Sequence, residues 1–404
     1  MVDAGAQGSA ARARRDVKDA HAGVAGIQVD VRPADDMALA DYDRFCRDGV
    51  HAPAQHPLWV RSWVEATGAD VVIATLHRDH GPACALVLEI VQEGPFRIAR
   101  FVGGRHANGN FVAIADRHEA PLSPAEAQML VEAIRINRRD VDLLLLQRQN
   151  PVHDGIPNAF TNVQTMRSPN VSLSVDLSGG FEEMLGRRGG KRKRKKLRQQ
   201  GRKFEEAGGY RLIEAKTREE ADRLLDAFFA MKAARFAEKG IPNVFAPRDV
   251  QAFFRLLFGG AVELAQPPFL LHSIEVAGTL RAVNGCSVAD HSIVCEFGGI
   301  CEGIANTSPG FILDYHSIEE ACSMGKAFYD FSVGDEEYKR SWCDVETWQF
   351  DTMLPLTARG RVIWAFEMAR AQTVRLVKSN EALWSVLKQL RAKVAGTKPA
   401  PAEH

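Results

Sequence analysis

Two stretches of the chain alternate short apolar runs with turn residues, which is the pattern of antiparallel strands. The first covers residues 70–104 and is interrupted by glycine-containing turns. The second covers residues 269–299, with turns at Ala277-Gly278 and Ala289-Asp290. Each stretch predicts an antiparallel meander.

Helical patterns surround both meanders, and a short apolar strand comes next. The first meander is followed by a predicted helix at 123–136 and a strand at 141–147. The second is followed by a predicted helix at 308–325 and a strand at 327–333. Helices, meander, helix and strand therefore occur twice, which predicts an internal structural repeat. We expect an α/β class built from α+β mixed sheets, with helices on both faces of each sheet.

The segments before the meanders show apolar faces and capping residues that are typical of helices. Residues 39–49 and 56–68 precede the first, and the latter segment places Trp59 and Trp63 on one face. The helix before the second meander should begin with a capping box of Thr217 and Glu220. Gly240 and Pro242 should end it.

A chain of 404 residues exceeds the usual size of one domain. We place a domain boundary between about residues 149 and 170. The expected organisation is a disordered leader at 1–26, a first domain at 27–165, a second domain at 166–358, amphipathic C-terminal helices at 359–396 and a disordered tail at 397–404.

Composition narrows the choice of partners. The 51 basic residues balance 51 acidic ones, so total charge gives no argument for nucleic acid or membranes. The seven cysteines are scattered, without zinc spacing, and no apolar run approaches the roughly 18 residues of a transmembrane helix. We expect reduced thiols, a cytoplasmic protein, no transmembrane segment and no metal.

The start of the helix at 308 could seat an anion. Ser308 suits the N-cap, Pro309 suits the first turn, and Gly310 allows a close approach to the backbone. Free amides and the positive end of the helix dipole favour a phosphate there. A well-capped helix without a ligand fits the same residues.

The most basic segment runs from Arg187 to Lys203 and contains eleven lysines or arginines and no acid. Six consecutive cations, Lys191 to Lys196, would cover every face of a helix, so burial of one face does not explain them. They suit the phosphates of a nucleotide, an RNA or an anionic lipid. A solvated flexible linker is equally compatible.

A polar loop follows the predicted strand at 327–333. Gly334 allows a sharp turn, Asp335 and Glu337 could accept a proton, and Lys339 could neutralise a developing oxyanion. Such loops at strand ends commonly carry active groups. A surface cluster of ion pairs is the alternative.

Taken in order, these segments resemble a known family. Ser308 to Gly310, a helix, Gly325, a strand and Gly334 to Trp342 resemble GNAT superfamily acyltransferases of the CelD-like group, described as cellulose-biosynthesis proteins with a BioF-like acetyltransferase domain and distantly related to FemAB aminoacyl transferases. The resemblance is good over about residues 170–350 and rests mainly on layout before that. It implies two tandem GNAT-like domains, the first one degenerate, and acyl transfer from acetyl-CoA or another acyl-CoA to an amine or hydroxyl.

The resemblance also suggests roles for single residues. The chain departs from the family pattern at Thr307, where an aromatic residue is usual, and at Phe236, where a tryptophan is usual, and of the glycine-rich pyrophosphate loop only Gly310 remains. We assign catalysis to Lys339, Asp335 and Tyr338; donor binding to Ser308, Pro309, Gly310, Arg194 and Arg198; and acceptor binding to Arg235, Glu337 and Trp342.

Two other functions stay open. One is a FemAB-like transferase that uses an aminoacyl-tRNA, with the tRNA on residues 187–203. The other is a GNAT-fold adaptor that binds a polyanion without catalysis. For the enzyme, the acceptor would be a small molecule or saccharide, in polysaccharide or cell-envelope metabolism. Because the first domain lacks a counterpart of the 334–342 loop, we expect it to shape the acceptor groove.

Overall fold

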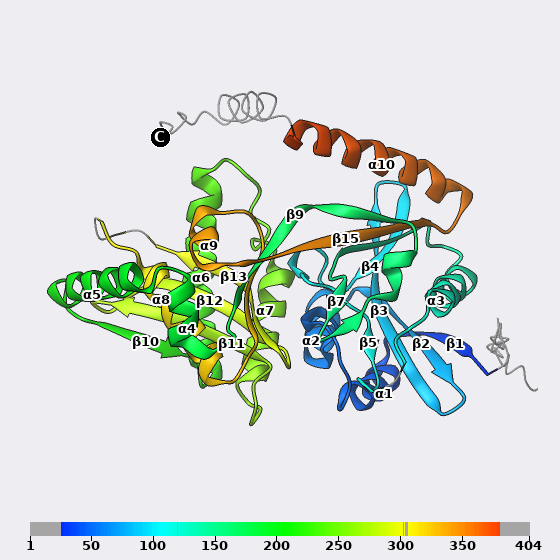
Figure 1. Ribbon diagram of the computed structural model, residues 1–404. Helices are drawn as coiled ribbons and strands as arrows, with labels where there is room; N and C mark the ends of the chain where they lie inside the picture. Colours follow the sequence, from blue (N-terminus) through cyan, green and yellow to red (C-terminus); the bar gives the residue numbers. More distant parts are fainter. Residues whose placement is uncertain (1–25, 119, 302, 304–305, 380–404) are drawn as a thin grey trace, which may run out of the picture.

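The computed structural model describes residues 26–118, 120–301, 303 and 306–379 (Figure 1). The leader and tail that we predicted, and the second of the C-terminal helices, lie outside the described residues. The first C-terminal helix is present as α10 (Ala358–Ser379). In the described part of the chain, no helix is both long and apolar enough to cross a membrane.

The first half begins with a strand that was not predicted, and the two predicted helices and the predicted meander follow it. A helix and a strand then follow the meander. The main elements are β1 (Gln28–Pro33), α1 (Asp36–Cys46), α2 (Pro57–Thr67), β2 (Asp70–Arg78), β3 (Gly81–Glu93), β4 (Phe96–Phe101), α3 (Pro124–Asn137) and β6 (Leu143–Gln149).

Short elements complete this half and lead into the next. They are η1 (Pro53–Gln55), η2 (Gly104–His106), β5 (Ala113–Ile114), β7 (Val152–His153), β8 (Ile156–Pro157), η3 (Ala159–Asn162) and the long strand β9 (Thr165–Asp176).

The second half repeats the same order with one additional helical hairpin in front. Its elements are α4 (Gly180–Arg187), α5 (Gly190–Glu206), β10 (Tyr210–Glu214), α6 (Arg218–Glu238), α7 (Arg248–Ala261), β11 (Phe269–Val276), β12 (Thr279–Val288), β13 (Ser292–Ile300), α8 (Pro309–Ser323), β14 (Phe328–Val333), α9 (Glu337–Trp342) and β15 (Val345–Pro355).

The strand pairing repeats as well. In the first half β1, β2, β3 and β4 pair antiparallel, and α3 then leads to β6, which is parallel to β4. In the second half β10 to β13 pair antiparallel, and α8 leads to β14, which is parallel to β13. Even a backbone irregularity recurs, because Arg148 in β6 (φ 55°) and Ser332 in β14 (φ 62°) both adopt the left-handed conformation. The predicted mixed α/β class and the internal repeat are confirmed.

The two halves exchange their last strands. β9 follows the first half in sequence but pairs with β14, whereas β15 follows the second half and pairs with β6. β9 and β15 also pair with each other, so one continuous 13-stranded sheet runs through the described part of the molecule. In Figure 1 these two long strands connect the halves. The exchange gives each half a strand contributed by the other.

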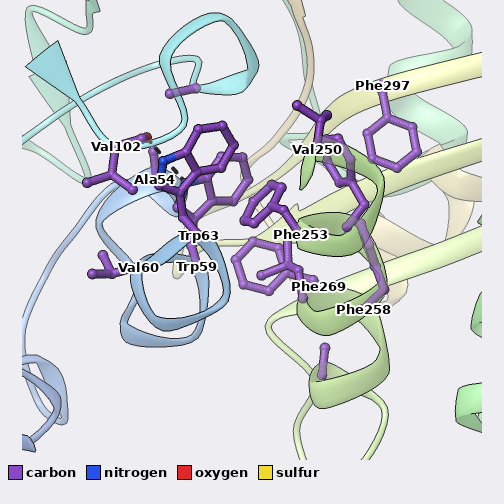
Figure 2. Close-up of a cluster of buried hydrophobic side chains, with 14 of the residues drawn as sticks. Ala54, Trp59, Val60, Trp63, Val102, Val250, Phe253, Phe258, Phe269 and Phe297 are labelled. Carbon is purple, nitrogen blue, oxygen red and sulfur yellow. Dashed lines mark hydrogen bonds between the residues drawn. The ribbon is translucent and has the colours of Figure 1, made fainter. Parts of the chain in front are cut away.

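An aromatic core joins the halves away from the sheet junction. Trp59 and Trp63 of α2 each meet Phe253 of α7 edge to face, with ring centroids 4.9 Å apart in both pairs (Figure 2). Trp63 Nε1 donates a hydrogen bond to Glu89 Oε2 at 2.8 Å. The predicted tryptophan face is therefore buried against the other repeat, where aromatic pairs add stability beyond their buried area.

The start of α6 differs in detail from the predicted capping box. Thr217 Oγ1 accepts a hydrogen bond from the Glu220 N–H at 3.2 Å, as expected. The Glu220 carboxylate, however, accepts from the N–H of Lys216 at 2.8 Å and not from that of Thr217. Gly240, with φ 61°, follows the last turn of the helix as predicted.

Candidate functional site

A pocket of about 540 Å³ lies where α5, α8 and α9 meet. Ligand pockets for molecules of drug or cofactor size usually enclose roughly 300–1,000 Å³. Its described lining consists of Arg192, Lys193, Lys196, Ile300, Thr307, Ser308, Pro309, Gly310, Phe311, Asp314, Glu337, Tyr338, Ser341 and Trp342. A second cavity, between the halves, encloses only about 70 Å³.

The parallel strands β13 and β14 part near this pocket. Their pairing runs from Ser292 opposite Phe328 to Val294 opposite Asp330. Beyond that point β13 continues to Ile300, which lines the pocket, while β14 turns into the 334–336 loop that leads to α9. Beyond Val294 and Asp330, no further pairing joins the two strands among the described residues.

The start of α8 lines the pocket without the predicted side-chain cap. Ser308 occupies the N-cap position, but its side chain makes no capping hydrogen bond. Instead, its N–H donates to Gln200 Oε1 of α5 at 2.7 Å. Lys203 of α5 also donates to the carbonyl of Asn306, at 2.7 Å. The segment that leads into α8 is therefore held by α5.

The basic segment is an ordered, amphipathic helix, which corrects two expectations drawn from its charge. α5 buries Gly190, Lys193, Gln200, Gly201 and Phe204, so one face is packed although Lys191 to Lys196 are all cations. A flexible linker is excluded for the same reason.

Lys193 shows how a cation is accommodated on the buried face. Its ammonium donates to the carbonyls of Arg188 and Ser341, each at 2.7 Å, and lies 4.5 Å from the centroid of the Trp342 ring. Burial lowers the pKa of Lys193 to about 8. This lysine joins α5 to α9 and serves the structure of the pocket wall.

Arg192 and Lys196 are the cations of α5 that face the pocket from its exposed side. They stand four residues apart, one helical turn, and both side chains are exposed. Lys196 Nζ lies 4.3 Å from the centroid of the Phe311 ring. Burial, followed by the charge of Arg192, lowers the pKa of Lys196. Two adjacent cations beside a helix start favour an anionic ligand.

Asp314, like Arg192 and Lys196, lines the pocket but was not among the predicted site residues. It lies one and a half turns into α8, is 8% exposed, and accepts a hydrogen bond from Asn284 Nδ2 at 3.2 Å. Burial raises the pKa of Asp314 to about 7, although the bond from Asn284 and the charges of Lys339 and Lys196 act in the opposite direction. A signal was present, because Asp314 stands four residues before Ile318 and seven before Ala321, on the apolar side of the predicted helix.

Tyr338 lies at the pocket in the first turn of α9. Burial, and then nearby anions that include Asp314 and Glu336, raise the pKa of Tyr338 well above its usual value. The phenol therefore keeps its proton at neutral pH and can donate a hydrogen bond, although half of the side chain is exposed. Trp342, from the same helix, is 1% exposed and stacks on Phe311 with ring centroids 5.4 Å apart.

The structure brings together six of the eleven predicted site residues: Ser308, Pro309, Gly310, Glu337, Tyr338 and Trp342. Arg194 contacts Glu182, Asp335 contacts Arg340, and Arg198 and Arg235 are exposed; all four lie outside the pocket lining.

Lys339 also lies outside the lining, in a buried position. Its ammonium donates to the carbonyl of Val333 at 2.9 Å and lies 3.4 Å from that of Ser332. Glu336 Oε2 is 3.2 Å away. These partners hold the end of β14, where Ser332 has its positive φ.

Two more carboxyl side chains, both half-buried, lie near the place where the pairing of β13 and β14 ends. Glu296 is the extra residue of a β-bulge, because Phe297 pairs with Gly285 while Cys295 pairs with Cys286. It accepts a hydrogen bond from the Ser287 hydroxyl at 2.7 Å, and burial raises its pKa to about 8.

Asp330 of β14 is the second of these carboxyls. Its Oδ1 accepts from the Ser332 N–H at 2.7 Å and from the Ser172 hydroxyl at 3.1 Å, and burial raises the pKa of Asp330. Tyr329 and Phe331, its neighbours in β14, belong to the core packed against α8, so Asp330 points to the opposite face of the sheet. The Asp330 charge also contributes to the raised pKa of Glu296, which places the two carboxyls near each other.

Comparisons with known proteins agree with this geometry. Residues 191–340 match the family described as "Acetyltransferase (GNAT) domain", and this range includes α5, α8 and most of α9. No curated protein matches the chain.

Solved structures with a similar fold cover most of the chain. The crystal structure of FemX is 11% identical in sequence, with a TM-score of 0.55 over 78% of this chain and 96% of its own. A conserved protein of unknown function from Bacteroides thetaiotaomicron VPI-5482 is 10% identical, with a TM-score of 0.50 over 82% of this chain and 100% of its own. At these identities the likeness concerns the fold. Apart from Ser341 and Trp342, the described lining of the pocket falls within the residues that match the family described as "Acetyltransferase (GNAT) domain".

Proposed function

We propose that this protein is an acyltransferase that binds an acyl-CoA in the pocket between α5 and α8 and transfers the acyl group to an amine or hydroxyl. One observation carries the proposal. A single pocket combines two cations, Arg192 and Lys196, the start of α8, and two titratable side chains, Asp314 and Tyr338.

The donor would be held mainly through its phosphates. Arg192 and Lys196 supply charge-assisted hydrogen bonds from α5, and the first turn of α8 supplies the positive end of a helix dipole. Phe311 and Trp342 give the pocket an apolar wall. Ser308, Pro309 and Gly310 keep their predicted place beside the donor.

Transfer would follow direct attack of the acceptor on the thioester. The acceptor nitrogen or oxygen forms a bond to the carbonyl carbon, its proton passes to Asp314, the carbon–sulfur bond breaks, and Tyr338 gives its proton to the leaving thiolate. A base with a pKa near the working pH is the most effective, and burial gives Asp314 such a pKa, about 7. Asn284 fixes the orientation of this carboxylate.

The acceptor would approach from the other face of the sheet. Glu296 and Asp330 provide half-buried hydrogen-bonding groups there, where the pairing of β13 and β14 ends. Such groups suit a polar small molecule or a saccharide. In this arrangement the donor and the acceptor meet through the sheet.

Lys339 then becomes a positioning residue in place of the catalytic role suggested by the sequence. Its contacts with the carbonyls of Ser332 and Val333 fix the loop that carries Tyr338 into α9. Glu337 and Trp342 remain proposed ligand contacts, since both line the pocket.

Donor binding tests the proposal directly. Acetyl-CoA and longer acyl-CoAs should raise the melting temperature of the wild-type protein, because a ligand that binds only the folded state stabilises it. Arg192→Ala with Lys196→Ala should remove most of this shift. The matched control, Lys191→Ala with Lys195→Ala, changes exposed cations of the same helix outside the pocket lining and should retain it. Absence of any shift at saturating donor would refute the proposal.

An aminoacyl-tRNA donor is the second candidate. The exposed side chains of Lys191, Lys195 and Arg198 extend the positive charge of α5 beyond the pocket. A bound tRNA would contact these residues, and its affinity would fall steeply with salt. Loss of tRNA binding in the Lys191→Ala, Lys195→Ala variant, without loss of acyl-CoA binding, would assign the outer cations to RNA.

A further inference from the structure

Glu214, His272 and Glu320 form a polar cluster outside the donor pocket. Their side chains come from β10, β11 and α8, and each offers one ligand atom, all within 4.8 Å of one another. His272 is 6% exposed, whereas Glu214 and Glu320 are partly exposed. The cluster therefore has a buried end and an end open to solvent.

The imidazole of His272 is the unusual member. Neither ring nitrogen has a hydrogen-bond partner among the described residues, although both nitrogens are buried. Nε2 lies 3.4 Å from Glu320 Oε2 without hydrogen-bond geometry. A buried polar group without a partner costs free energy, so its retention needs an explanation.

We propose that Glu214, His272 and Glu320 bind a divalent transition-metal ion, with zinc as the best match. Zinc takes imidazole nitrogen and carboxylate oxygen at about 2.0–2.2 Å, which places neighbouring ligands of a tetrahedral site about 3.3–3.5 Å apart. The separation of 3.4 Å between His272 and Glu320 fits this value. Three protein ligands leave a fourth position for water. Lys216 contacts Oε1 of Glu214 and leaves the other carboxylate oxygen for the ion.

The position of the site gives it a structural consequence. Glu214, His272 and Asn284 are direct cross-strand neighbours on β10, β11 and β12. Asn284 holds Asp314 of α8, and the metal would hold Glu320 of the same helix. The ion would thus fix α8 to the sheet at a second point, independently of any donor in the pocket.

Zinc titration of the full-length, metal-stripped protein tests the site by calorimetry and by thermal unfolding. We expect one zinc ion per chain and a higher melting temperature with zinc. His272→Ala and Glu320→Gln should each weaken binding at least tenfold. Glu320 is partly exposed, so the second variant remains informative if the first folds poorly.

His316→Ala is the matched control. His316 and Glu319 form an exposed pair on the same helix, with Nδ1 3.1 Å from the carboxylate, and the variant should bind zinc like the wild type. Two results would overturn the proposal. One is a wild-type protein that binds no zinc. The other is full zinc binding by folded His272→Ala or Glu320→Gln protein, which would place the ion elsewhere, for instance on thiols.

Discussion

The helices α3 and α8 hold equivalent places in the two repeats, and both begin with Ser-Pro, but their starts differ. At α3, Ser123 Oγ accepts from the Glu126 N–H at 3.3 Å, and Glu126 Oε2 accepts from the Ser123 N–H at 2.8 Å, a complete capping box. At α8, Ser308 makes no side-chain cap and donates its N–H to Gln200 of the neighbouring helix.

The difference gives a physical reason to expect the proposed anionic donor at the second repeat and not at the first. Glu126 places a carboxylate on the start of α3 and is ion-paired with Arg78. Burial raises the pKa of Glu126, but the hydrogen bonds from Arg78 and Ser123 prevail and lower it to about 2, so the group stays negative. The residue at the equivalent position of α8, three after Ser308, is the uncharged Phe311, which lines the pocket. In the first repeat the carboxylate of Glu126 occupies the start of α3. In the second repeat the cations Arg192 and Lys196 lie beside the start of α8.

The chemistry differs in the same way. Six residues after the N-terminal serine of each helix, α3 has Met129 and α8 has Asp314.

We expect Asp314→Asn to lower turnover at least about a hundredfold, since the amide cannot accept the proton. The wild-type rate should rise with pH through about 7, as Asp314 loses its proton. Glu319→Gln, at an exposed position of α8, should have the wild-type rate and profile. An unchanged pH profile in Asp314→Asn would remove the assigned base.

The same variant should be more stable than the wild type in alkaline solution. The pKa of Asp314 is about 7 in the folded protein and should be near 4 when unfolded, so the folded state binds more protons between these values. Stability contributed by this group therefore falls as pH rises through that window. The Asp314→Asn variant lacks this charge, and we expect it to be more stable than the wild type by up to about 4 kcal/mol at pH 8, with little difference at pH 4. Denaturant unfolding at both pH values measures the difference, and equal stability at pH 8 would contradict the assigned pKa.

Replacement of Lys339 should cost stability as well as activity. The sequence-based expectation is a catalytic lysine that could be removed without loss of folding. The structure instead buries its ammonium against the carbonyls of Ser332 and Val333. We expect Lys339→Met to lower the free energy of unfolding by about 2 kcal/mol. Asp335→Ala, which removes an exposed pair with Arg340, should change it by less than about 0.5 kcal/mol. An unaltered melting temperature in Lys339→Met would return the residue to a purely chemical role.

The smallest predicted effect is the difference in stability loss between replacement of Ser123 and replacement of Ser308. Ser123→Ala removes a working cap and should cost about 1 kcal/mol, whereas Ser308→Ala should cost less than about 0.3 kcal/mol. Chemical denaturation of both variants gives the comparison. Equal losses would mean that the two helix starts are capped alike.

Most of the repeat could be predicted because turns and periodicity are local. The meanders, α3, α8 and β14 all follow from such signals. The exchange of β9 and β15 could not, since a strand's partner depends on contacts far away in sequence. The site was predictable where residues cluster in the chain, as from Ser308 to Gly310.

The residues that sequence reasoning missed acquire their properties from contacts that form only in the folded protein. Lys193 is buried within a run of cations because carbonyls of Arg188 and Ser341 meet its ammonium. Asp314 acquires its raised pKa only from burial. Glu214, His272 and Glu320 have no shared motif, and only the sheet and α8 bring them together.

The stoichiometry of donor binding tests the central claim, that only the second repeat holds an anionic donor. Calorimetric titration of the full-length protein with acetyl-CoA should give one molecule per chain. The affinity should fall at least about tenfold in Arg192→Ala with Lys196→Ala, while an Arg78→Ala variant at the first repeat should bind like the wild type. Two molecules per chain, or undiminished binding in the folded α5 variant, would contradict the account.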